Sequence, residues 1–273
     1  MKKLCIPLFV ALLSIQYFTG CSNLPKRSAD FDEVSSEMNE LAVLPATFQI
    51  QEVGAFSSEL ESEMNYDIEK EIKKAVKAVI EESQIDLARL DTSDEVLRSA
   101  PELRRAIFDH TAAIADAHKA IAESDGKVID VKYQGNIDAF ADLSDCDCFV
   151  YVEGTGYFKT GGAVAKDIAL ASIFAVLFGS QPTTEATSAT TLSGYIIDAN
   201  RGRVVWYNEK TRAGSDPRKP THILESVQDL FKPLFGQSKI RWDEDQDNEI
   251  IDKYEEQLKE MEENETDQSE EET

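Results

Sequence analysis

Basic residues are scarce in this sequence: 28 Lys and Arg stand against 52 Asp and Glu, which gives a formal net charge of −24 at pH 7. A chain of this charge is repelled by nucleic-acid phosphates and by anionic lipid head groups, so we predict no nucleic-acid partner. Much of the excess lies at the C-terminal end, because residues 243–273 hold sixteen acidic residues against two lysines, a net charge of −14.

Residues with catalytic or metal-binding chemistry are also few. The three histidines are His110, His118 and His222, and none of them belongs to a His-Glu-x-x-His motif. The sequence also lacks a Gly-x-Ser-x-Gly nucleophile turn and a convincing paired-carboxylate frame. We therefore predict no catalytic residues, no metal site and no cofactor. An enzyme of a type that these motifs do not reveal stays an alternative.

Cysteine is scarce too, with four residues at positions 5, 21, 146 and 148. Cys146 and Cys148 stand two residues apart at the start of a run rich in aromatic and β-branched residues, where strand geometry would put both side chains on one face. One interpretation is a pair of small buried strand residues. The other is a redox pair that forms a disulfide within or between chains, which an oxidising compartment permits.

No apolar run reaches the ~20 residues that a membrane-spanning helix needs. The run nearest the N-terminus, Leu4 to Ile15, follows Lys2 and Lys3 and leads to Thr19-Gly20-Cys21. A basic start, a short apolar stretch and a small-residue end are typical of a secretory signal peptide.

The Gly20-Cys21 pair makes this leader resemble a bacterial lipoprotein signal, in which the cysteine sulfur is acylated and the cysteine becomes the new N-terminus. The resemblance implies a lipid bilayer as partner through acylated Cys21, and Ser22 favours the outer membrane. Phe18 departs from the leucine that such signals prefer at this place. The alternative is an ordinary cleaved signal peptide, which would leave Cys21 as a free thiol.

Composition and hydrophobic periodicity divide the chain into four regions. They are a signal peptide at 1–20, a polar lipidated tether at 21–38, a single α/β domain at 39–236 and an acidic tail, disordered or partly helical, at 237–273. The predicted order of elements is β-α-α-β-β-α-β-β-α, with the helices packed on a mixed sheet. The predicted strands cover 41–50, 127–133, 148–158, 190–197 and 203–208, and the predicted helices cover about 59–83, 99–124, 163–178 and 222–235.

The last two predicted strands are joined by Asp198-Ala199-Asn200-Arg201-Gly202, and Trp206 lies on the return strand. Asp198 can cap this turn and Gly202 can take a positive φ, so all three residues have a structural interpretation. Together with Leu41 to Pro45 and the strand after Asp145, this hairpin makes the domain resemble the periplasmic α/β domain of Gram-negative envelope lipoproteins related to the curli-secretion lipoprotein. Asn200-Arg201-Gly202 replaces the usual Thr-Gly turn of that family.

The family resemblance implies a non-catalytic protein that binds other envelope components or forms homo-oligomers. We accordingly predict an outer-membrane-anchored lipoprotein that faces the periplasm. It would act as a binding, scaffold or accessory subunit of a cell-envelope assembly, with envelope proteins as partners.

One apolar insert at 163–178 supports an alternative function. Its sequence predicts a buried helix, but a helix on the lipid surface or at a subunit interface stays open, because small residues allow close packing. With the helix on the lipid surface or at a subunit interface, the protein would be a membrane-active or channel-forming oligomer. The residues predicted to make such contacts are Ile168, Leu170, Ile173, Phe174, Leu177 and Phe178.

Overall fold

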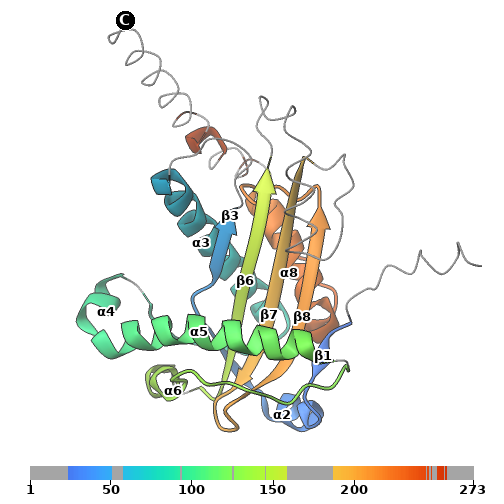
Figure 1. Cartoon of the computed structure of the whole chain (residues 1–273). Helices are drawn as coiled ribbons and strands as arrows, with labels where there is room; N and C mark the ends of the chain where they lie inside the picture. The colour runs from blue at the N-terminus through green and yellow to red at the C-terminus, as the bar shows by residue number, and fades with distance from the viewer. Residues whose placement is uncertain are drawn as a thin grey trace, which may run out of the picture.

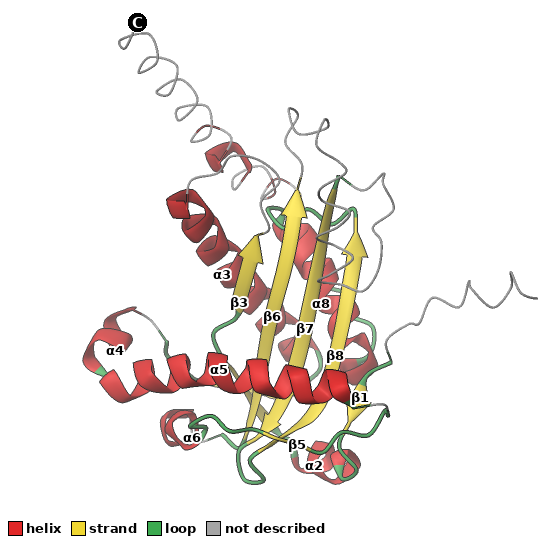
Figure 2. Cartoon of the chain, viewed as in Figure 1, coloured by secondary structure: helices red, strands yellow, loops and turns green. Residues whose placement is uncertain are grey.

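The computed structural model describes residues 24–50, 58–92, 94–124, 126–144, 146–158, 187–243, 245, 247, 251–254 and 256. These residues form a mixed sheet with helices on both faces, which confirms the predicted α/β class and the single domain (Figure 1, Figure 2). Cys21 and the apolar insert at 163–178 lie outside the described residues.

The described elements include several short ones that the predicted order lacks. The strands are β1 (Lys26–Arg27), β2 (Glu40–Val43), β3 (Thr47–Ile50), β4 (Asp86–Ala88), β5 (Val131–Lys132), β6 (Cys148–Phe158), β7 (Ser188–Asp198) and β8 (Arg203–Ala213). The helices are α2 (Phe31–Glu37), α3 (Ser58–Glu82), α4 (Asp94–Ser99), α5 (Pro101–Glu123), α6 (Asp138–Ser144) and α8 (Pro220–Phe235).

Three long strands form the centre of the sheet. β6, β7 and β8 are each 11 residues long and antiparallel, with β7 between the other two. β2 and β3 run parallel to β6 along its outer edge, and β4 pairs with β2. On the opposite edge, β1 and β5 pair antiparallel with β8. The main path through the sheet is therefore β1-β8-β7-β6-β2-β4.

Two apolar clusters fill the two sides of this sheet. On one side, α3 and α8 cover Val150 and Trp206, and the Trp206 ring stacks on Phe231 with 5.5 Å between centroids. On the other side, α5 contributes Ile114 to the cluster that contains Tyr151. Val150 and Tyr151 belong to different clusters because successive side chains of a strand point to opposite faces. Figure 1 shows α5 crossing the strands in front, with α3 and α8 behind.

The predicted tether at 21–38 ends earlier than expected. Residues 26–27 form β1 and residues 31–37 form α2, in which Phe31 and Val34 are buried in the core. The sequence pattern did not indicate these elements because β1 is two residues long and α2 has only two apolar core residues. Both depend on contacts with distant parts of the chain.

Part of the predicted tail packs against the domain. Trp242 lies against the cluster formed by α3 and α8, and Tyr254 is fully buried. The Tyr254 hydroxyl donates to Asp67 Oδ2 (2.8 Å), and Lys253 Nζ pairs with the same carboxylate (2.8 Å) and with Glu63 (2.7 Å). Two aromatic side chains and one lysine thus attach a segment beyond residue 236 to α3, in spite of its acidic composition.

Candidate functional site

The N-terminal arm, which we define as residues 24–37, connects the domain to the predicted lipid site. β1 pairs with β8 at Lys26 and Arg27. Ser28 N donates to Val205 O (2.9 Å), and on the other side Arg27 N donates to Lys127 O (2.8 Å). The arm is therefore bonded along both of its edges, to β8 and to the chain that follows α5.

Lys26 caps the C-terminal end of α5. Its Nζ donates to Ile121 O (2.6 Å), Ser124 O (3.0 Å) and Ser124 Oγ (3.1 Å). The last carbonyls of a helix have no partners within the helix and carry the negative end of its dipole, so an ammonium group there is stabilising. Because α5 has no basic residue in its own last turn, Lys26 supplies this cation from a distant part of the sequence.

Arg27 has the same role at the end of α8. Its Nη2 donates to Pro233 O (3.2 Å), and its guanidinium carbon lies 4.9 Å from the centroid of the Phe31 ring. The C-terminal ends of two helices thus meet beside β1, and each basic residue of β1 binds one of them. This arrangement explains why Lys26-Arg27 is part of the sheet and not of a solvated tether.

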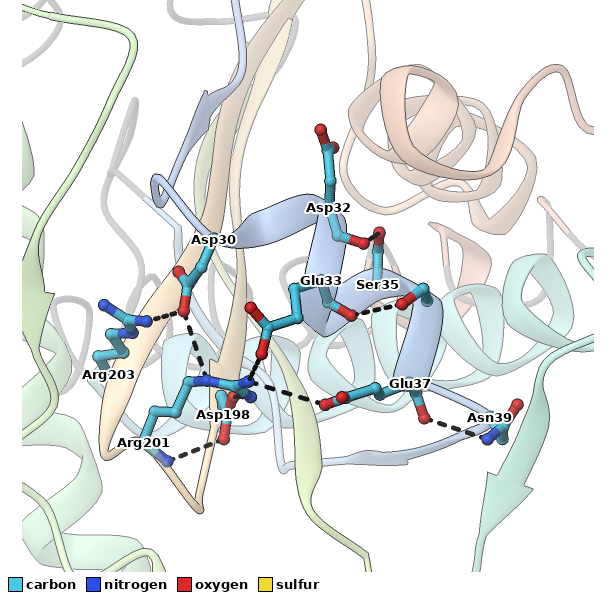
Figure 3. Close-up of polar contacts among 10 residues, drawn as sticks. Asp30, Asp32, Glu33, Ser35, Glu37, Asn39, Asp198, Arg201 and Arg203 are labelled. Atoms are coloured by element: carbon cyan, nitrogen blue, oxygen red, sulfur yellow. Dashed lines mark hydrogen bonds and ion pairs between the residues drawn. The ribbon is translucent and has the colours of Figure 1, made fainter.

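An ion-pair network joins α2 to the hairpin between β7 and β8 (Figure 3). Arg201 is its centre, and its guanidinium contacts four carboxylates, those of Asp198 (2.7 Å), Glu33 (2.9 Å), Asp30 (3.4 Å) and Glu37 (3.7 Å). Arg203 also pairs with Asp30. The hydrogen bond to Asp198 raises the pKa of Arg201, so its guanidinium stays charged.

Asp198 and Gly202 shape the hairpin that carries Arg201. Asp198 Oδ1 accepts a hydrogen bond from Arg201 N (2.9 Å), and Gly202 has a φ of +58°, which side chains with a Cβ atom rarely adopt. Trp206, by contrast, lies in the core behind the sheet. The structure therefore brings Asp198 to the arm through Arg201, and Gly202 shapes the turn between them. Trp206 pairs with Arg27 of the arm through its backbone, while its side chain lies on the core side of the sheet. The contacts of Arg201 left no signal in the sequence because Glu33 is 168 residues away.

A second group of polar side chains lies beneath α5. His118 Nδ1 is 2.7 Å from Tyr195 Oη and 3.2 Å from Glu153 Oε1, and the Tyr195 hydroxyl donates to the same Glu153 oxygen. Beside this group, Tyr207 Oη donates to Glu209 Oε2 (3.0 Å), with 5.2 Å between the Tyr195 and Tyr207 ring centroids. We call these five residues the polar cluster.

The charges of the polar cluster depend on one another. The hydrogen bond with Glu153 raises the pKa of His118 above its usual value, although burial acts in the opposite direction. Burial and the nearby Glu153 carboxylate raise the pKa of Tyr195, so its phenol stays protonated. The cluster can hold a proton between His118 and Glu153, and it joins α5 to β6 and β7. Tyrosines on neighbouring strands were the sequence signal that could have located it.

Cys146 and Cys148 are both free and buried. Cys148 belongs to the cluster behind the sheet, whereas Cys146 belongs to the cluster under α5, so the expectation of a shared face is wrong. The rule that residues two apart on a strand share a face does not apply here. β6 begins at Cys148, so Cys146 precedes the regular strand. Burial raises the pKa of both thiols, to about 12 for Cys148, which disfavours the reactive thiolate.

In the described part of the chain, no three His, Cys, Asp or Glu side chains are arranged to hold a metal ion. None of its helices is long and apolar enough to cross a membrane.

Comparisons with known proteins give only distant likenesses. No protein-family model and no curated protein matches the chain. Among solved structures, the PelC dodecamer from Paraburkholderia phytofirmans is 12% identical with a TM-score of 0.32, and the match covers 72% of this chain and 89% of that one. Lipoprotein GNA1162 from Neisseria meningitidis is 8% identical with a TM-score of 0.29, with 64% and 80% covered. The LpoB C-terminal domain from Salmonella enterica is 11% identical with a TM-score of 0.27, with 76% and 93% covered.

Proposed function

We propose that this protein is a lipoprotein anchored in the outer membrane through acylated Cys21, with its α/β domain facing the periplasm. The domain is a non-catalytic binding or scaffold subunit of a cell-envelope assembly. Its partners are the lipid bilayer, through the acyl chains, and one or more envelope proteins.

The attachment of the N-terminal arm is the observation that carries this proposal. β1 begins five residues after Cys21 and is bonded to β8, to the end of α5 and to the end of α8. One acyl chain holds a protein to a membrane only marginally, whereas two or more hold it stably. Acyl chains on Cys21 would therefore hold the folded domain directly at the bilayer surface.

The polar groups of the domain support a binding role over a catalytic one. In the polar cluster, Glu153 accepts a hydrogen bond from Tyr195, and His118 contacts both of them. In the ion-pair network, Arg201 joins the hairpin to α2. Both groups connect elements of the domain to one another, as expected for a rigid body that presents surfaces to partners.

Fatty-acid labelling of the full chain in cells tests the anchor. Cys21→Ala is expected to abolish the label, because it removes the sulfur that carries the acyl chain. Cys5→Ala is the matched control and is expected to leave the label unchanged, because the predicted leader is removed before the protein matures. Labelling that persists in Cys21→Ala contradicts the proposed anchor.

Crosslinking in living cells, followed by pull-down of the anchored chain, tests the scaffold role. We expect an envelope protein to be recovered with the wild-type chain. If no envelope protein is recovered, the scaffold role is contradicted. The alternative of a channel-forming oligomer depends on residues 163–178, and no observation within the described residues favours it.

A further inference from the structure

The distance between the lipid site and the fold is short. Only Ser22, Asn23, Leu24 and Pro25 separate Cys21 from β1. Five residues span at most about 17 Å when fully extended. The 23 residues of α5, by comparison, extend for about 34 Å. A chain anchored at Cys21 would therefore keep one particular corner of the domain near the bilayer.

That corner contains β1 and the C-terminal ends of α5 and α8. Lys26 binds the last carbonyls of α5, and Arg27 binds the Pro233 carbonyl near the end of α8. Figure 1 shows β1 next to the end of α5. Because these contacts fix β1 to both helices, the fold fixes the place on the domain where the described chain begins, at Leu24 and Pro25.

Two of the exposed large apolar side chains of the domain lie at this corner. Leu24 is 53% exposed and lies two residues before β1. Val128 is 63% exposed, and its backbone pairs with Arg27 in a parallel bridge. Exposed apolar side chains next to a lipid attachment point can enter the interface between head groups and acyl chains. Their position beside the chain exit distinguishes them from the other exposed apolar residues.

The local charge at this corner differs from that of the whole chain. Lys127 and Lys232 are exposed here, beside the half-buried Lys26 and Arg27. Acidic residues nearby in the sequence are Glu123, Asp125, Asp130 and Asp229, of which Asp229 pairs with Arg212 (3.1 Å). In a chain of net charge −24, this corner therefore lacks the large acidic excess of the whole chain, so phosphate head groups repel it less than they repel the acidic surfaces elsewhere.

We propose that a membrane-facing corner, formed by Leu24, Lys127, Val128 and Lys232, lies against the phospholipid surface in which Cys21 is anchored. The C-terminal ends of α5 and α8 point to the bilayer, and the opposite end of α5 points away from it. This inference rests on the proposed lipid anchor and adds to it the orientation of the domain.

Lipid quenching of a fluorescent label tests this orientation. The full acylated chain is reconstituted into vesicles of phosphatidylethanolamine and phosphatidylglycerol, some of which carry a nitroxide on the head group. The label is attached to Val128→Cys or, as the matched control, to Phe108→Cys. Phe108 is 78% exposed on α5, and it lies thirteen residues before Ile121, about 20 Å along the helix axis. The parent chain, treated with the same label, corrects for reaction at the buried Cys146 and Cys148.

We expect the label at position 128 to lose most of its fluorescence with nitroxide lipid and the label at position 108 to keep its fluorescence. Equal quenching at both positions, or stronger quenching at position 108, in a chain that is acylated and floats with the vesicles overturns the orientation and leaves the anchor intact. A chain that carries no fatty acid and does not float with the vesicles overturns the anchor, and the orientation with it.

Discussion

Replacing Lys26 by methionine tests the attachment of the arm most directly. Methionine keeps an unbranched apolar stem but removes the ammonium group that binds Ile121 O and Ser124 O at 2.6 and 3.0 Å. A hydrogen bond to a charged group contributes about 1.5–3 kcal/mol, and a cation at a helix C-terminus about 0.3–1 kcal/mol. Lys26 is half-buried, so water replaces part of this interaction in the variant. We therefore expect Lys26→Met to destabilise the closed arm by about 1–2 kcal/mol.

Hydrogen exchange at the Arg27 and Ser28 amides measures opening of the arm, because these amides donate to Lys127 O and Val205 O. A loss of 1.4 kcal/mol corresponds to a factor of ten, so protection of these amides should fall about tenfold in Lys26→Met. Lys127→Met is the matched control, since Lys127 is an exposed lysine in the segment that lies beside β1. If Lys26→Met lowers protection no more than Lys127→Met does, the helix-capping argument is wrong.

Burial lowers the pKa of His110 from 6.5 to about 3, so the unfolded chain binds a proton between these values and the folded chain does not. The free energy of unfolding should therefore fall by about 1.4 kcal/mol per pH unit as the pH drops from 6.5 toward 3. In urea titrations, His110→Phe should remove this contribution to the slope. An unchanged slope refutes the lowered pKa of His110. The pKa of His118 is instead raised by its hydrogen bond with Glu153, so its contribution is complete below pH 6.5 and is lost as the pH rises through the raised value. In thermal melts, His118→Gln should differ more from the wild type at about pH 6 than at about pH 9, and equal differences would count against the pairing. Trp206→Ala should cost about 3–5 kcal/mol in urea unfolding, because its fully buried ring stacks on Phe231. Trp206→Phe should cost clearly less, since Trp206 Nε1 has no hydrogen-bond partner among the described residues, and equal costs for the two variants would contradict this.

The long elements could be predicted from the sequence because their hydrophobic patterns are strong. The predicted helix at 59–83 corresponds to α3 at 58–82, and the predicted strand at 148–158 corresponds to β6. Of the predicted strand at 127–133, only β5 at 131–132 and a single bridge at Val128 are present. β5 pairs with only the first two residues of β8, and Val128 pairs with Arg27 of the arm. Short segments whose partners are far away in the sequence carry too weak a pattern for such a prediction.

The candidate site could be predicted only in part. The turn residues Asp198 and Gly202 are recognisable by type, because a short acid and a glycine are what such a turn needs. The partners of Arg201 in α2 could not be predicted, because electrostatic contacts across 168 residues leave no local spacing. The polar cluster could not be predicted for a similar reason, since His118 and Glu153 come into contact only when α5 crosses β6.

The sequence by itself determined the class of the fold, the predicted leader that ends at Cys21 and the strongly acidic balance of the chain. These properties depend on local composition and periodicity, which can be read from the order of residues alone. Only the tertiary structure decided that Lys26 and Arg27 are helix caps and not part of a tether. Two helix ends, remote from each other in the sequence, converge beside β1, and their last carbonyls provide the negative potential that holds both cations.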